Sequence, residues 1–158
     1  MRAKAHIDGG ARPTNPGHAG FAVVIHLDGH THVLSRYIGW RSNNVAEYFA
    51  LIMAVKYARG LGASHLEVFC DSKLVVEQVL GRWRVKSDEL RPLSREARES
   101  LDKFFPGAWS LTWVRREDNS EADSFCTKAI QAGMYANPWV RRHFSKGQRG
   151  KIIDPFRP

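Results

Sequence analysis

The chain has 158 residues, enough for one domain with a substantial core, and its 43% hydrophobic and 25% charged residues are typical of a soluble globular protein. The net charge of +8 favours a polyanionic partner, although a merely basic protein would carry the same charge. No apolar run reaches membrane-spanning length and no signal-peptide core is present, so we expect a cytoplasmic protein without membrane contact. Two cysteines (Cys70, Cys126) are too few for a disulfide framework, so we expect both to be free thiols.

The first third of the chain predicts three strands and a long helix. The segments "AKAHID" (3–8) and "GFAVVIHL" (20–27) are typical of strands, and "DGH" (28–30) is typical of a hairpin turn into "THVLSRYIG" (31–39). From residue 42 to residue 62 the apolar residues recur at helical spacing. Polar Ser42 to Asn44 supply the N-cap of this helix, and two glycines stand at its end.

The remainder of the chain alternates between strands and helices. Strands are predicted at 65–70 and 109–115, and helices at 72–80, 87–105 and 120–133. The complete order is three strands, a helix, a strand, two helices, a strand and a helix. Connections from strand through helix to strand favour parallel pairing of the later strands. We therefore expect an α/β fold in which helices pack on a mixed sheet.

Four acids stand at the ends of these predicted elements. Asp8 ends the first strand and Asp71 directly follows the strand at 65–70, whereas Glu47 lies in the first turn of the long helix and Asp123 at the start of the last one. The carboxyl ends of parallel strands converge on one crevice. Carboxylates gathered there need neutralisation, which hard divalent cations with oxygen ligands provide. Two such ions about 3.5–4 Å apart would clamp the attacking and leaving oxygens of a phosphodiester.

Each acid also has a purely structural explanation. Asp8 and Asp71 could be turn formers at strand ends, and Glu47 could complement the helix dipole. Asp123 completes the pattern Ser120-x-x-Asp123, which matches a capping box. For any one acid alone the structural explanation is preferable. Their joint placement is what favours a metal site.

Four segments resemble the type 1 ribonuclease H family, in particular its compact branch without a basic protrusion. They are "IDGGARPTNPGHAGFAVVI", "SNNVAEYFALIMAV", "VFCDSKLVVEQVLGRWRVK" and "WVRREDNSEADSF", which occur in the family's order and cover most of residues 5–130. The resemblance implies a ribonuclease H-like fold, with three antiparallel strands followed by parallel strands in a five-stranded mixed sheet that has helices on both faces. It also implies an endoribonuclease that hydrolyses the RNA strand of RNA–DNA hybrids with two divalent metal ions, Mg²⁺ or Mn²⁺.

Position by position, the resemblance implies a set of four metal-binding catalytic carboxylates: Asp8, Glu47, Asp71 and Asp123. Asp123 is preferred to Asp118 as the last member, because the residues around it then fall in register. Asp8 would bridge the metal ions that position and deprotonate the attacking water, and Asp123 would hold the ion beside that water. Cleavage would leave a 5′-phosphate and a 3′-hydroxyl.

The resemblance also implies a set of residues that contact the hybrid: Gly9, Gly10, Asn15, Ser42, Asn43, Asn44, Trp83, Lys86 and Asn119. The glycines and Asn15 would belong to a loop that approaches the RNA. Asn43 and Asn44 would reach the minor groove, where 2′-hydroxyls distinguish RNA from DNA. Ser42 would bind a DNA-strand phosphate, and Trp83 would pack near the DNA backbone with Arg82, Arg84 and Lys86 as phosphate partners. A core position that closes a helix is the alternative for Trp83.

The chain departs from the family pattern in three places. The segment "GRWRVKSDELRP" (81–92) passes straight through the region where some relatives carry the basic protrusion. No histidine lies between Trp113 and Asp123, so Arg116 is assigned the auxiliary catalytic role of stabilising charge or releasing product, with a plain surface arginine as the alternative. The segment "ARPTNPG" is one residue longer than usual, which affects the placement of Asn15.

The end of the chain falls largely outside the resemblance. We expect a catalytic domain at 1–132 and a basic extension at 133–158, whose aromatic residues dock on the domain or whose cations bind nucleic acid. A non-cleaving hybrid-binding module and a different metal-dependent nuclease of the same fold are alternative functions. The complete carboxylate set argues against the first, and the segments "NNVAE" and "GRW" argue against the second. No obligate protein partner is evident, and we expect a monomer.

Overall fold

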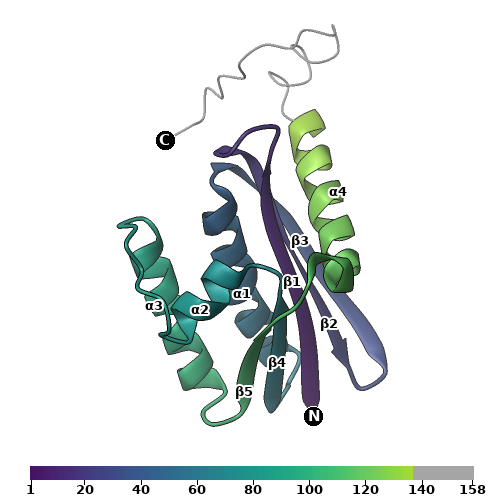
Figure 1. The fold of residues 1–158 in the computed structure, drawn as a ribbon. Coiled ribbons are helices and arrows are strands. Elements are labelled where there is room, and N and C mark those ends of the chain that lie inside the picture. Colours follow the sequence, from purple (N-terminus) through teal and green to yellow (C-terminus); the bar gives the residue numbers. More distant parts are fainter. Residues whose placement is uncertain (137–158) are drawn as a thin grey trace, which may run out of the picture.

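The five strands form one mixed sheet with helices on both faces (Figure 1). The structure is a computed structural model and describes residues 1–136. The strands are β1 (Arg2–Arg12), β2 (Gly17–Leu27), β3 (His30–Arg41), β4 (His65–Cys70) and β5 (Trp109–Trp113). The helices are α1 (Asn43–Gly60), α2 (Lys73–Val79), α3 (Leu90–Phe104) and α4 (Ser120–Ala136), with a short 3₁₀ helix, η1 (Arg116–Asn119), before α4.

Strand β1 lies at the centre of the sheet, whose strand order is β3-β2-β1-β4-β5. The first three strands form an antiparallel meander, whereas β4 pairs parallel with both β1 and β5. The hairpin between β2 and β3 turns at Asp28 and Gly29, whose φ angles of 52° and 76° lie in the left-handed region that such two-residue turns require. The predicted mixed sheet, with its parallel later strands, is confirmed.

Strand β1 is longer than the sequence predicted. It continues beyond Asp8 to Arg12, and both glycines remain paired with β2. The expectations that Asp8 ends the strand and that Gly9 and Gly10 belong to a loop are therefore wrong; the loop consists of residues 13–16. Position 9 requires glycine, because a Cβ there would lie 2.4 Å from main-chain atoms of α1. This glycine lets the helix approach the strand.

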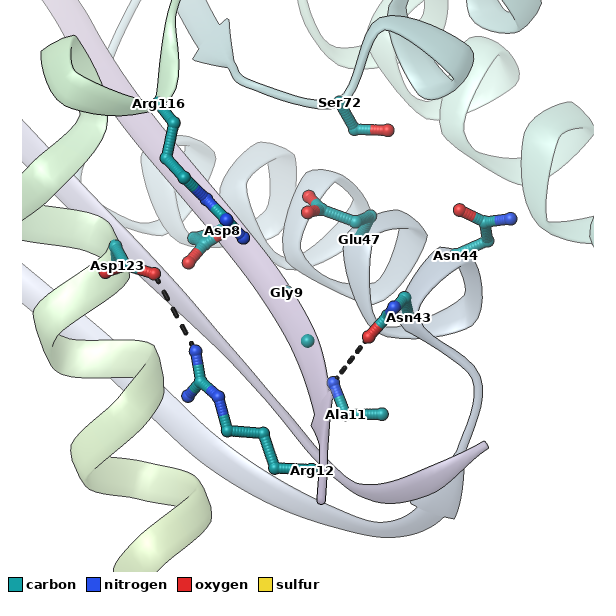
Figure 2. A pocket seen from close by; sticks show the side chains of 11 residues that line it. Asp8, Gly9, Ala11, Arg12, Asn43, Asn44, Glu47, Ser72, Arg116 and Asp123 are labelled. Atoms are coloured by element: carbon teal, nitrogen blue, oxygen red, sulfur yellow. Dashed lines mark hydrogen bonds and ion pairs between the residues drawn. The ribbon is translucent and has the colours of Figure 1, made fainter. Parts of the chain in front are cut away.

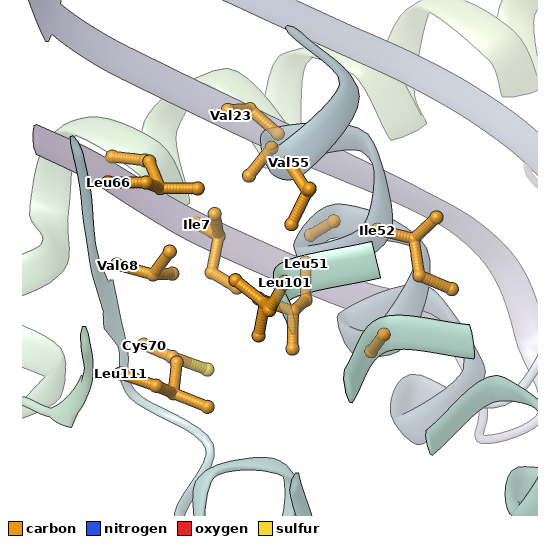
Figure 3. Close-up of a cluster of buried hydrophobic side chains, with 14 of the residues drawn as sticks. Ile7, Val23, Leu51, Ile52, Val55, Leu66, Val68, Cys70, Leu101 and Leu111 are labelled. Carbon is orange, nitrogen blue, oxygen red and sulfur yellow. The ribbon is translucent and has the colours of Figure 1, made fainter. Parts of the chain in front are cut away.

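The main hydrophobic core fills the space between the sheet and α1 to α3 (Figure 3). Its fully buried members include Ile7 of β1, Leu51 of α1, Leu66 of β4 and Leu101 of α3. A smaller cluster of Ala22, Cys126 and Ile130 joins α4 to the opposite face of the sheet. Cys70 and Cys126 are both free and buried, as expected. Helices on the two faces thus hold β1 and its carboxylate in place.

Helix α4 continues through the domain boundary predicted at residue 132 as far as Ala136, the last residue that the structure describes. Most of the predicted basic extension, residues 137–158, lies outside the described part of the chain, so the division into two segments stays a prediction. Within residues 1–136, no helix is both long and apolar enough to span a membrane.

Candidate active site

Parallel pairing of β1 with β4 brings the first two predicted acids together. Ile7 pairs with Cys70, so that the residues that follow, Asp8 and Asp71, lie side by side at the same edge of the sheet. Helix α1, which packs against β1 on the face of the sheet opposite to α4, supplies Glu47. The carboxylate oxygens of Asp8, Glu47 and Asp71 lie within 4.8 Å of one another. The predicted convergence of these three acids is therefore present.

Burial and mutual repulsion strongly disfavour the ionised forms of these acids. Burial, followed by the charges of Asp71 and Asp123, raises the pKa of Asp8 to about 7. Burial, followed by the charges of Asp8 and Asp71, raises the pKa of Glu47 well above its usual value. Burial also raises the pKa of Asp71, against the opposing hydrogen bond from Asn119 and the charge of Arg116. Among the described residues, no ion pair relieves this three-carboxylate cluster.

The donor set of this cluster fits a hard divalent cation. Asp8 and Glu47 are only 6% and 7% exposed, and buried charges of one sign are stable only when a counter-charge lies among them. All the converging ligand atoms are carboxylate oxygens, which Mg²⁺ and Mn²⁺ prefer. Asp8, Glu47 and Asp71 are thus the residues that would hold a metal ion.

Two arginines and the fourth acid complete the cavity beside the cluster (Figure 2). The cavity has a volume of about 220 Å³ and includes Arg116 and Asp123 in its lining. Asp123 lies outside the group of three carboxylates but close enough to Asp8 to raise its pKa. Arg116 lies on the other side of Asp8, and its charge lowers the pKa of Asp71. A phosphate in this cavity would therefore meet cations as well as carboxylates.

The first turn of α1 and the end of β1 form a second wall of the cavity. Gly9, Gly10, Asn43 and Asn44 all line it. The Asn43 side-chain oxygen accepts a hydrogen bond of 2.7 Å from the Ala11 main-chain N–H, which fixes the helix start against the strand. These four predicted substrate-binding residues therefore lie beside the carboxylates.

Asn15 and Ser42 lie at the rim and hold the start of α1. The Asn15 side-chain oxygen accepts a hydrogen bond of 2.9 Å from the Asn43 main-chain N–H, although Asn15 itself does not line the cavity. Ser42 is the N-cap of α1, as predicted, and its hydroxyl accepts a hydrogen bond of 3.2 Å from the Val45 N–H. The longer loop thus places Asn15 on the helix terminus.

Asn119 is not positioned to contact a substrate. It is only 2% exposed, and its side-chain amide donates hydrogen bonds to the Ile7 carbonyl at 2.8 Å and to the Asp71 carboxylate at 3.3 Å. This corrects the substrate contact expected from the sequence. The side chain instead joins β1, Asp71 and the segment that carries Arg116 and Asp123.

Trp83 and Lys86 lie on the surface between α2 and α3, outside the cavity lining. Trp83 is 45% exposed, which excludes the alternative that it is a core residue. Its neighbour Arg82 forms an ion pair of 3.1 Å with Glu77. Trp83 and Lys86 are thus accessible, but the three-carboxylate cluster does not depend on them.

Three residues of the cavity lining, Ala11, Arg12 and Ser72, were not predicted from the sequence, and two of them, Arg12 and Ser72, have polar side chains. Arg12 reaches the cavity because β1 continues to that residue on the same face as Asp8. Ser72 is the N-cap of α2, and its hydroxyl accepts a hydrogen bond from the Val75 N–H. The signal for Ser72 was its place directly after Asp71. The signal for Arg12 was hidden by the two glycines that made the strand look shorter.

Sequence comparisons agree with this geometry. The family model described as "Reverse transcriptase-like" matches residues 6–129. Ribonuclease HI of Halobacterium salinarum is 36% identical over 132 residues, which cover 82% of this chain and 64% of that protein. A bifunctional protein of Mycobacterium tuberculosis is 40% identical over 135 residues, which cover 84% of this chain and 36% of that protein. The chain thus spans less than two thirds of the length of either relative.

Solved structures match over most of the chain. The crystal structure of the Halobacterium salinarum ribonuclease H1 is 36% identical with a TM-score of 0.78, and the match covers 84% of this chain and 99% of that one. A ribonuclease H1 from compost, crystallised with an RNA/DNA hybrid, is 36% identical with a TM-score of 0.76, covering 83% of this chain and 98% of that one. The fold, the carboxylate cluster and these relatives agree: this chain belongs to the type 1 ribonuclease H family.

Proposed function

We propose that this chain is an endoribonuclease that hydrolyses the RNA strand of RNA–DNA hybrids with two divalent metal ions, Mg²⁺ or Mn²⁺. The observation that carries the proposal is the group of three carboxylates, Asp8, Glu47 and Asp71, within 4.8 Å of one another beside an open cavity. Membership of the ribonuclease H family and a relative crystallised with an RNA/DNA hybrid support the choice of substrate.

The four acids have distinct tasks in this proposal. Asp8, Glu47 and Asp71 would hold one ion, and Asp8 with Asp123 would hold a second. Bound ions supply Lewis acidity and lower the pKa of a coordinated water. The water oxygen forms the new bond to phosphorus, the bond from phosphorus to the 3′-oxygen breaks, and that oxygen takes up a proton. The products are a 5′-phosphate and a 3′-hydroxyl.

The remaining residues bind and orient the hybrid. Arg116 lies beside Asp8 and Asp71 and would stabilise the extra negative charge on the phosphate during cleavage. Asn43 and Asn44 face the cavity from the first turn of α1, where their amides would read 2′-hydroxyls in the minor groove. Gly9 and Gly10 line the cavity, where their main chain would approach the RNA. Ser42 and Asn15 at the rim, and Trp83 and Lys86 on the neighbouring surface, would contact the two backbones.

A cleavage assay tests the proposal directly. End-labelled RNA–DNA hybrid, duplex DNA and duplex RNA are each incubated with the full chain in Mg²⁺, Mn²⁺ or EDTA. We expect metal-dependent cutting of the hybrid only, and RNA fragments whose 3′ ends a polymerase extends without phosphatase treatment. Asp71→Asn should abolish cutting, whereas Asp28→Asn in the exposed hairpin should not. Absence of cutting by the wild type in both metals would refute the proposal.

The two alternative functions give different outcomes in the same assay. A non-cleaving module would bind the hybrid but leave it intact. Another nuclease of this fold would cut duplex DNA or duplex RNA. The carboxylate cluster disfavours the first alternative, because a binding protein for a polyanion gains nothing from buried negative charge. A monomeric state and a cytoplasmic location stay predictions from the sequence, and sedimentation analysis would test the first.

A further inference from the structure

Arg12 is a cation in the cavity that the proposed reaction does not use. It stands four residues after Asp8 on β1, and because side chains alternate along a strand, both point to the face of the sheet that α4 covers. Figure 2 shows its guanidinium directed at Asp123. The guanidinium nitrogen nearest to Asp123 lies 4.0 Å from the carboxylate oxygen. Arg12 is thus the counter-charge of the one acid that lies outside the three-carboxylate cluster.

Helix α4 fixes the guanidinium at two points. Thr127 lies one turn after Asp123 on α4, and its hydroxyl accepts a hydrogen bond of 2.8 Å from Arg12. The planar fork of an arginine allows one nitrogen to bond Thr127 while another faces Asp123. The side chains of Arg12 and Asp123 are 43% and 38% exposed, so that their ion pair is held in place but is easily exchanged.

We propose that Arg12 is a built-in counter-cation of Asp123, which competes with a divalent ion for this carboxylate and turns to a phosphate of the RNA strand when metal and hybrid bind. The part that concerns the hybrid rests on the proposed function. A metal ion at Asp123 displaces the guanidinium, and an arginine always keeps its charge, so it then binds another anion. A backbone phosphate crossing the cavity provides the bidentate partner that a guanidinium prefers.

Arg116 does not have this role, because it forms no ion pair with Asp123. Its charge acts on Asp71, and no described carboxylate forms an ion pair with it. The two arginines therefore flank the carboxylates from opposite sides (Figure 2). Arg116 can bind a substrate phosphate with or without metal. Arg12 can bind one only when a metal ion has replaced its guanidinium at Asp123. Hybrid and metal consequently assist each other's binding through Arg12.

Three variants of the full chain test the competition for Asp123. Arg12→Gln removes the charge, and Arg12→Lys keeps it without the fork. Arg2→Gln removes one charge from the start of the same strand, roughly 33 Å away at about 3.3 Å per residue. Mn²⁺ binding to the protein without hybrid is measured by calorimetry. We expect Arg12→Gln to bind Mn²⁺ about two- to fivefold more tightly, the range for an exposed ion pair. The Arg12→Lys and Arg2→Gln variants should stay near wild type.

The competition is refuted if Arg12→Gln binds Mn²⁺ no more tightly than Arg2→Gln, or if Arg12→Lys binds it as tightly as Arg12→Gln. Unfolding curves of all variants in EDTA show whether each retains the fold. Because calorimetry needs no cleavage, it decides on the competition even if the wild type fails to cut hybrids. That failure would refute the proposed function alone.

Measurements of hybrid binding test whether Arg12 contacts a phosphate of the RNA strand. Fluorescence anisotropy of a labelled hybrid in Ca²⁺, a divalent ion that carboxylate oxygens bind, is repeated at several salt concentrations, and a gel confirms that the RNA strand stays intact. The titrations give the affinity and its salt dependence with a cation present for Asp123. One lost phosphate contact lowers the slope of log K against log salt by about 0.9. We expect Arg12→Gln to show that loss together with weaker binding, in contrast to Arg2→Gln. An unchanged slope and affinity in Arg12→Gln would refute the phosphate contact.

Discussion

Replacing Asp8 by asparagine should abolish metal binding and yet stabilise the metal-free protein. The pKa of Asp8 is about 7 in the fold, against a usual value of 3.8. The native state therefore holds a proton on Asp8 between about pH 4 and pH 7, whereas the unfolded chain has lost it. Because the native state binds more protons in that window, stability falls as the pH rises through it and stays low above pH 7.

The size of the effect follows from the two pKa values. Asp8 costs the native state about 2 kcal/mol at pH 5, where the fold keeps its carboxyl protonated, and up to about 4 kcal/mol at pH 8, where the carboxyl is ionised, at about 1.4 kcal/mol for each pKa unit. An asparagine side chain at this position would carry no charge at either pH. Asp8→Asn should therefore raise the melting temperature at pH 8 by several degrees, and by less at pH 5.

Thermal unfolding in EDTA at pH 5 and pH 8 measures this difference. Asp28→Asn is the matched control, because Asp28 is exposed in a hairpin turn that also accepts asparagine. Its effect should be the same at both pH values. Added Mg²⁺ should stabilise the wild type but not Asp8→Asn. The reasoning is refuted if Asp8→Asn is no more stable than wild type at pH 8, or if its gain does not depend on pH.

Four other predictions concern the same site. Gly9→Ala should lower the free energy of unfolding in urea by at least about 1–3 kcal/mol, because its Cβ would overlap the α1 main chain, whereas Gly10→Ala, with its nearest contact at 4.0 Å, should change it little. Asn119→Ala should cost about 1–3 kcal/mol of stability by leaving the Ile7 carbonyl without its donor, and should weaken Mn²⁺ binding in calorimetry. Trp83→Ala should weaken hybrid binding in anisotropy without altering the melting temperature; the reverse pattern would indicate a packing role. Mn²⁺ should bind more weakly at pH 6 than at pH 8, with proton release that calorimetry in two buffers detects, because Asp8 must lose its proton.

The sequence predicted the three-carboxylate cluster because its members are placed by element order. Asp8 and Asp71 directly follow paired residues of two neighbouring parallel strands, β1 and β4, and the strand–helix–strand connection through α1 had favoured that parallel direction. Glu47 lies one turn into a helix that Ser42 caps, so its position along α1 was set locally. Such features follow from periodicity and capping, which short segments determine by themselves.

The remaining features depend on contacts between distant segments. Glycines are depleted in strands, so the sequence favoured an early end of β1 and concealed Arg12. The strand continues because β2 supplies partners up to Arg12 and because Gly9 faces the main chain of α1. Asn119 was assigned to the substrate because nothing local shows that its amide is buried against Ile7, which lies 112 positions earlier in the chain. Tertiary packing decided both cases.

The central place of β1 also sets the order in which the site acquires its charge during folding. The β1–β3 meander and α1 are neighbours along the chain, so their contacts close short loops, whereas β4 must return to β1 from beyond α1. Asp71 reaches Asp8 and Glu47 only at that later step. Repulsion between the acids therefore opposes the docking of β4 rather than the formation of the meander. A divalent ion stabilises the completed sheet but not the β1–β3 meander alone. Magnesium should therefore lower the unfolding rate much more than it raises the folding rate.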